Sequence, residues 1–283
     1  MMDENPYESL ADEHGLDGHW AFGTGFTDPL AGIDTSVPEG VDADALAAYC
    51  LALGDDALVY SHRLQQWMTR LPELEEETAL ANVALDLLGQ ARMLLARAGT
   101  ILGRTEDALA FFRTEDEFGN VRLVERADQD FAELVARLLV FATWRLALFD
   151  RLRGAGDPVL AAIAAKGVAE LAYHRDYAAQ WVVRLGDGTD LSHRRMQAAL
   201  GTVWPLVDEL FAARPGDVVT PDRREFDLVL DTVLATARLE RPEAAPLAAV
   251  GGRSGRDGVH TEDLGYVLAE LQSVARAHPD ATW

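Results

Sequence analysis

The chain has a single cysteine, Cys50, and a single lysine, Lys166, among its 283 residues. One cysteine cannot form an intrachain disulfide, nor can it supply the thiolates of a cysteine-based zinc or iron–sulfur site. Cys50 lies at helical spacing from Leu46 and Leu53. This spacing predicts a small buried apolar residue rather than a nucleophile.

Positive charge is also scarce, because 25 Lys and Arg face 47 Asp and Glu, for a formal net charge of −22. Binding of nucleic acid needs clustered cations that neutralise phosphates, so we expect no nucleic-acid partner. The excess of acid is typical of a solvated acidic surface. Nucleotide-binding glycine loops and nucleophile motifs are likewise missing.

Long apolar runs are missing as well. No stretch of about 18 apolar residues occurs, and the first residues, MMDENPYESL, are acidic rather than basic and then apolar. We therefore expect neither a membrane span nor a signal peptide, and a cytoplasmic location is the default expectation.

What the sequence does contain is helical periodicity. Residues 1–43 are rich in Gly, Asp, Pro and Thr and predict a loosely structured N-terminal extension, whereas residues 44–283 predict one helical domain. The patterns predict two pairs of long helices separated by a crossover, followed by shorter helices. The predicted ranges are 43–69, 74–102, 129–153 and 157–185, then 191–213, 222–239 and 261–277. This order predicts an all-α, ferritin-like four-helix bundle with additional C-terminal helices.

Ferritin-like bundles that bind two irons take one carboxylate from each of two helices and a Glu-x-x-His motif from each of the other two. In the first predicted pair, Asp56 stands for the single carboxylate and Asp86 for the start of the motif. Gly89 occupies the position of the histidine, and the neighbouring Gln90 is a poor iron ligand. The first half of the template is therefore incomplete.

The second predicted pair is incomplete in a different way. Glu170 is followed by Tyr173 at the histidine position, with His174 one residue further, about 100° around the helix. Glu133, near the start of its helix, is the best remaining carboxylate. We expect no catalytic, cofactor-binding or metal-binding residue in this chain. The alternative is a di-iron oxygenase or ferroxidase that uses Asp56, Asp86, Glu170 and His174 as an atypical ligand set.

Structural roles explain the same residues. Asp55 and Asp56 follow Gly54, and they mark either a kink with a new helix start or an internal polar site. Asp86 lies either at the edge of an apolar stripe with a hydrogen-bond partner or inside a polar core site. His174 is best explained as a core histidine that Glu170 satisfies. Aromatic residues on the helices are candidates for a subunit interface or for the core: Tyr60, Trp67, Trp144, Phe149 and Trp181.

Four stretches of this sequence resemble the C-subunit family of the bacterial phenylacetyl-CoA epoxidase, the PaaC family. They are LALGDDALVYSHRLQQW, PELEEETALANVALDLLGQARMLL, DPVLAAIAAKGVAELAYHRDYAAQWVVRLGDGTD and GVHTEDLGYVLAELQSVARAHPDATW. These stretches span about residues 44–283, and the first 43 residues fall outside the resemblance.

The resemblance implies a ferritin-like structural subunit that lacks metal ligands and pairs with a catalytic A subunit in aerobic phenylacetate degradation. It implies that the di-iron centre and the acyl-CoA site belong to the A subunit, and that NADPH acts through a reductase subunit. Other subunits of the epoxidase complex are further expected partners. The sequence leaves open whether the isolated chain forms a homodimer.

Overall fold

The computed structural model describes residues 30, 32–71, 73–220 and 222–281. Within these residues the protein is all-α, and its only strand-like feature is an isolated bridge between Val250 and Arg253. Most of the predicted N-terminal extension, residues 1–29, lies outside the described residues, so its character stays a prediction.

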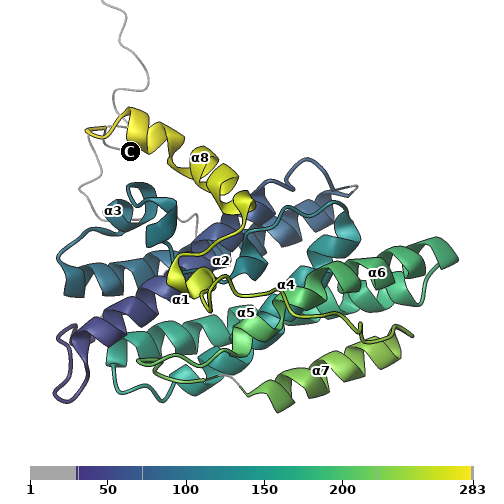
Figure 1. Ribbon diagram of the computed structural model, residues 1–283, viewed down its shortest axis with the longest axis horizontal. Helices are drawn as coiled ribbons and strands as arrows, with labels where there is room; N and C mark the ends of the chain where they lie inside the picture. Colours follow the sequence, from purple (N-terminus) through teal and green to yellow (C-terminus); the bar gives the residue numbers. More distant parts are fainter. Residues whose placement is uncertain (1–29, 31, 72, 221, 282–283) are drawn as a thin grey trace, which may run out of the picture.

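Four long helices form the bundle (Figure 1). Two of them, α1 and α2, pack closely as one pair, α4 and α5 form the second pair, and α2 also packs against α5. Their bounds are Ala43–Gln65 for α1, Leu74–Leu102 for α2, Phe131–Leu152 for α4 and Pro158–Gly186 for α5. Two helix pairs joined by one long crossover confirm the predicted ferritin-like, all-α fold.

The starts of these helices follow from capping residues. The side chain of Asp42 accepts a hydrogen bond from the backbone N–H of Ala45 at the start of α1, and Asp157 accepts one from Leu160 at the start of α5. Such caps satisfy amide groups that have no partner within the helix. Pro158 occupies the first turn of α5, where a missing N–H costs nothing.

The crossover between the two pairs contains a short helix, α3 (Glu106–Phe111), and two 3₁₀ turns, η2 (Glu115–Glu117) and η3 (Arg122–Val124). Near the end of the chain, the turn η6 (Gly255–Asp257) leads into α8 (Glu262–Ala277). α8 packs beside α3 and also contacts α1, as Figure 1 shows on one side of the molecule. The crossover and the end of the chain therefore cover the α1 side of the bundle together.

The second helix pair carries α6 (Asp190–Val203) and α7 (Arg223–Thr236). The predicted single helix over 191–213 was too long, because the α-helix ends at Val203 and the chain continues as the 3₁₀ turns η4 (Trp204–Leu206) and η5 (Asp208–Phe211). Pro205 explains the break, since a proline cannot donate the backbone hydrogen bond that an α-helix needs there.

Most residues of the predicted apolar stripes are buried in the core. Cys50 is fully buried, and burial raises the pKa of its thiol to about 12, as expected for a core residue rather than a nucleophile. Tyr60, Trp144 and Phe149 are buried in the core, so of the two roles considered for them the core is right and the interface is wrong. The helix faces that carry these three aromatic residues pack against other helices of the same chain.

One described helix, α2, is long and apolar enough to cross a membrane by length and composition alone. In the structure its apolar stripe, which includes Leu80, Leu87 and Leu94, is buried. That stripe faces neighbouring helices, mainly α1, as in the core helix of a bundle.

Candidate functional site

The residues that the di-iron template singled out come from all four bundle helices, but the structure does not bring them together. Asp86 pairs with His174 across the seam between α2 and α5. Asp56 lies on α1 in a separate buried cluster, and Glu133 lies at the start of α4. Glu170 belongs to a third group around Gln90.

Asp86 lies at the edge of the α2 stripe with a hydrogen-bond partner. Its Oδ2 is 3.0 Å from Nε2 of His174, and 35% of the Asp86 side chain is exposed, against 1% for His174. His174 is a core histidine, as predicted, but the predicted partner Glu170 was wrong. Glu170 instead contacts Gln90 and Lys166, so the ring of His174 is left for Asp86.

A chain of polar contacts crosses the centre of the bundle. Arg145 on α4 is fully buried and donates from Nε to Oε1 of Gln90, at 3.0 Å. Nε2 of Gln90 then donates to Oε2 of Glu170, at 2.9 Å, and the Lys166 ammonium pairs with the other oxygen of Glu170. Residues of α4, α2 and α5 are thereby linked in one line.

Asp55 and Asp56 belong to an unbroken helix, so the kink at Gly54 was wrong and the internal polar site is right. Both carboxylates are fully buried. Asp55 pairs with Arg113 and accepts a hydrogen bond from the backbone N–H of Gly119, at 2.9 Å. Burial raises the pKa of Asp55, while Arg113 opposes that rise.

Asp56 is surrounded by donors from two distant segments. Oδ2 of Asp56 lies 2.7 Å from Nη2 of Arg256, in the turn η6, and Oδ1 accepts from the backbone N–H of Val121, at 2.8 Å. Arg145 also approaches, with Nη1 at 3.9 Å from Oδ2. Asp56 therefore joins the crossover and the turn η6 to α1, and it is not a free carboxylate in the bundle centre.

Glu133 is a helix-start residue and not a member of the bundle centre. Its carboxylate accepts from the backbone N–H of Gln129, at 2.9 Å, while the Asp130 side chain accepts from the backbone N–H of Glu133, at 3.1 Å. Both bonds satisfy backbone amides at the start of α4, where Asp130 is the N-cap and Gln129 the residue before it. The candidate role of Glu133 as the single carboxylate of α4 was wrong for that reason.

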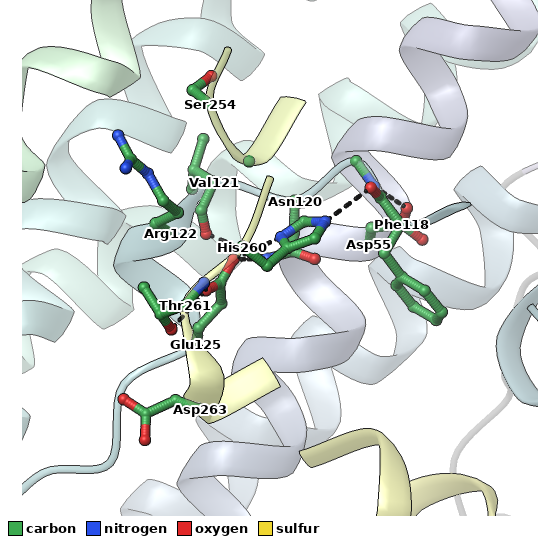
Figure 2. Close-up of polar contacts among 12 residues, drawn as sticks. Asp55, Phe118, Asn120, Val121, Arg122, Glu125, Ser254, His260, Thr261 and Asp263 are labelled. Atoms are coloured by element: carbon green, nitrogen blue, oxygen red, sulfur yellow. Dashed lines mark hydrogen bonds and ion pairs between the residues drawn. The ribbon is translucent and has the colours of Figure 1, made fainter. Parts of the chain in front are cut away.

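A second buried ionic group joins the crossover to α8 (Figure 2). Nδ1 of His260 is 2.7 Å from Oε1 of Glu125, and Nε2 of His260 is 2.9 Å from the carbonyl oxygen of Phe118. The other oxygen of Glu125 accepts from both the backbone N–H and the hydroxyl of Thr261, each at 2.7 Å. Because both ring nitrogens face acceptors, the doubly protonated imidazolium fits this place.

Burial alone would lower the pKa of His260. The hydrogen bond and the negative charge of Glu125 outweigh it, with further help from the Phe118 carbonyl and Glu115, so the pKa of His260 is raised above its ordinary 6.5. The surroundings of His260 therefore favour its charged form.

The donor set does not fit a di-iron centre. Among the described residues, no group of three or more His, Cys, Asp and Glu side chains is placed to hold a metal ion. Glu170 and Asp56 are each engaged by internal cations, and α4 contributes Arg145 to the centre where the template needs a carboxylate.

Sequence reasoning missed Arg145, Arg256 and His260. The signal for Arg145 was present, because an arginine interrupts the apolar run LLVFATWRLALF of the third predicted helix. For Arg256 and His260 no local signal existed, since each is paired with a residue more than a hundred positions away.

Comparisons with known proteins agree with this architecture. The model of the family described as "Phenylacetic acid catabolic protein" matches residues 33–283. The chain is 41% identical, over 245 residues, to the C subunit of the 1,2-phenylacetyl-CoA epoxidase of Escherichia coli (strain K12). That alignment covers 84% of this chain and 99% of the relative. The chain belongs to the phenylacetic acid catabolic protein family, and to the part of it that contains the C subunit of the epoxidase.

Proposed function

We propose that this chain is the non-catalytic structural subunit of a phenylacetyl-CoA ring epoxidase, which works in the cytoplasm in phenylacetate degradation. Its partner is a catalytic A subunit that carries the di-iron centre, and a reductase subunit supplies electrons from NADPH. The observation that supports this role most directly is the side-chain arrangement in the bundle. The carboxylates that would bind iron are paired with Arg145, Lys166, Arg256 and His174 instead.

A rigid bundle without chemistry of its own suits a scaffold. Active-site helices keep their geometry when surrounding elements hold them, and a second bundle docked beside a catalytic one provides such support. The buried ion pairs of this chain hold its own surface in a fixed shape. In this role the chain holds the catalytic subunit in position and supplies no reacting groups.

The candidate docking surface is the outer seam between α2 and α5. Leu85 on α2 and Tyr173 on α5 are 59% and 49% exposed, and each directly precedes a member of the Asp86–His174 pair that joins the two helices. An added Cβ at Gly89, one helical turn beyond Leu85, would meet nothing within 4 Å, so the space beside Gly89 is open. Exposed apolar groups on a flat helix pair are typical of a subunit interface.

Reconstitution tests the proposal. The purified chain is expected to show no oxygenase activity alone, and to restore NADPH-dependent epoxidation when it is added to the A and reductase subunits. Complexes with Glu170→Gln or Asp86→Asn are expected to keep wild-type turnover. Loss of turnover in these folded variants, or about two irons per chain by elemental analysis, would favour the alternative of an oxygenase or ferroxidase with an atypical ligand set.

The interface has its own test. Leu85→Arg and Tyr173→Arg are expected to reduce co-purification with the A subunit at least tenfold, because each places a charge in an apolar contact. Leu228→Arg on α7 is the matched control, since Leu228 is 70% exposed on a different helix. Equal retention by all three variants would rule out the α2–α5 seam. Mass measurement of the isolated chain shows whether it forms a homodimer, and the same measurement on Leu85→Arg and Tyr173→Arg shows whether the α2–α5 seam forms the contact.

A further inference from the structure

Arg145 occupies the place where the four helices of the bundle meet. It projects from α4 and donates a hydrogen bond to Gln90 on α2, and it also approaches Asp56 on α1. Gln90 in turn donates to Glu170 on α5, so Arg145 is linked to that helix indirectly. A ferritin-like metal site gathers its ligands from these same four helices. The guanidinium therefore lies among the four helices from which such a site would take its ligands.

The contacts of Arg145 are those of a built site. Nη2 donates to the carbonyl oxygen of Leu53, at 3.2 Å, in addition to the bond from Nε to Gln90. The guanidinium carbon lies 4.4 Å from the ring centroid of Phe149, so the ring face adds a cation–π contact. Burial lowers the pKa of Arg145 to about 10, which leaves it protonated at neutral pH.

Gly167 makes room for this arrangement. A Cβ at that position would lie 2.6 Å from the Phe149 ring and 3.4 Å from Nε2 of Gln90. Any side chain there would displace the ring that stacks on Arg145 or the amide that links Arg145 to Glu170. The glycine on α5 is therefore part of the site.

Buried carboxylates need a counter-charge, because an isolated ion in the interior is costly. In a metal-binding bundle the metal ions supply that charge. Here Asp56 faces two arginines, Arg256 at 2.7 Å and Arg145 at 3.9 Å. Arg145 is also linked through Gln90 to Glu170, whose second oxygen pairs with Lys166. Lys166 is the only lysine of the chain, and it is used at this place.

We propose that Arg145, assisted by Lys166, is a built-in substitute for metal charge, and that it excludes divalent cations from the centre of the bundle. This inference deepens the proposed function, because it names what keeps a structural subunit free of metal. It rests on the proposed function only for that interpretation. Replacing the guanidinium with a carboxylate turns the centre into a divalent-cation site beside Asp56, the acid that Arg145 approaches.

Cobalt binding to the full chain tests this inference. Arg145→Glu is expected to bind Co²⁺ at least tenfold more tightly than the wild type, by equilibrium dialysis and by the visible absorption of bound Co²⁺. Arg145→Met removes one of the two arginines beside Asp56 and leaves Oε1 of Gln90 without its donor. This variant is expected to melt at a lower temperature than the wild type and to regain part of the loss with Co²⁺. Arg145→Lys keeps a charge and is expected to gain no Co²⁺ binding.

Arg137→Met is the matched control, because Arg137 is a buried arginine of the same helix that pairs with Asp128 instead. Its melting temperature is expected to be insensitive to Co²⁺. The inference is overturned if the wild type binds Co²⁺ as tightly as Arg145→Glu. It is also overturned if Co²⁺ neither binds to Arg145→Glu and Arg145→Met nor restores their folding, as measured by circular dichroism. These results do not depend on epoxidation, so a failed reconstitution and a failed cobalt test are separate findings.

Discussion

Asp86 and Asp56 carry the same charge on neighbouring helices but stand in different surroundings. Asp86 is partly open to water and makes one contact with His174, whereas Asp56 is fully buried and contacts Arg256, Val121 and Arg145. A partly solvated carboxylate loses little when its partner is lost, whereas a buried one without its cation is strongly unfavourable. The two residues therefore differ in what a substitution costs.

For Asp86→Ala we expect a loss of about 1 to 2 kcal/mol in the free energy of unfolding, because one hydrogen bond goes and the buried Nε2 of His174 loses its partner. Urea denaturation of the isolated chain measures it. Asp150→Ala serves as the control, since the Asp150–Arg153 pair is about half exposed on both sides. A loss at Asp86 no larger than at Asp150 would mean that the contact with His174 contributes nothing.

At the residue scale, the absence of the two motif histidines could be predicted from the sequence, whereas the partner of His174 could not. Gly89 and Tyr173 stand in the sequence where histidines are needed, so the defect is visible without a structure. The partner of His174 was predicted as Glu170 because the two are four residues apart on one helix. A contact across helices, to Asp86, won instead, and helical spacing carries no information about such contacts.

At the scale of elements, buried charge pairs hold the crossover and the end of the chain against α1. Asp55 binds Arg113, Asp56 binds Arg256, and Glu125 binds His260. The two partners of each pair lie far apart in the sequence, and at least one of them lies in the crossover or in the segment just before α8, which have little regular structure of their own. The shape of this side of the molecule therefore depends on ionisation as well as on apolar packing.

The His260–Glu125 pair predicts a pH dependence. Because the folded-state pKa of His260 is raised above 6.5, its contribution to stability is complete below about pH 6.5 and is lost as the pH rises through the folded-state pKa. The slope for one proton is at most about 1.4 kcal/mol per pH unit. We expect the stability difference between wild type and His260→Gln to be largest near pH 6 and to shrink at higher pH.

Urea denaturation at several pH values measures this difference. Buried Asp55 and Asp128 also have raised pKa values, and comparison with His260→Gln removes their contribution because both proteins share them. Hydrogen exchange is expected to show faster opening of α8 in the variant. A stability difference that does not change between pH 6 and pH 9 would show that His260 does not titrate in this range.

The helices themselves were largely predictable because their signals are local. Periodic apolar residues and the caps at Asp42 and Asp157 set the bounds of the bundle helices to within a few residues. The first helix was predicted to reach residue 69 but ends at Gln65, where a turn takes over and Thr69 adopts a positive φ of 70°. The short helix α3 was missed, since six residues are too few to show a period.

For the whole molecule, the dominant feature is its charge of −22. Among the described residues, the buried acids are paired with arginines or, for Glu125, with His260. The excess negative charge of this part of the chain therefore lies on its surface, where like charges repel one another. Salt screens exposed charges over about 10 Å at 0.1 M and affects buried pairs much less. The net effect of added salt on stability is therefore set by relief of surface repulsion rather than by loss of the buried ion pairs.

We expect the melting temperature of the isolated chain to rise when NaCl is increased from about 10 to 300 mM, a range over which the screening length falls steeply. Relief of about 1 kcal/mol corresponds to a rise of roughly 2 to 4 °C for a chain of this size. The same titration with KCl separates screening from ion-specific binding, since screening depends only on ionic strength. A melting temperature that falls with salt would mean that exposed ion pairs, such as those of Arg241 with Asp227 and Asp231, outweigh the repulsion.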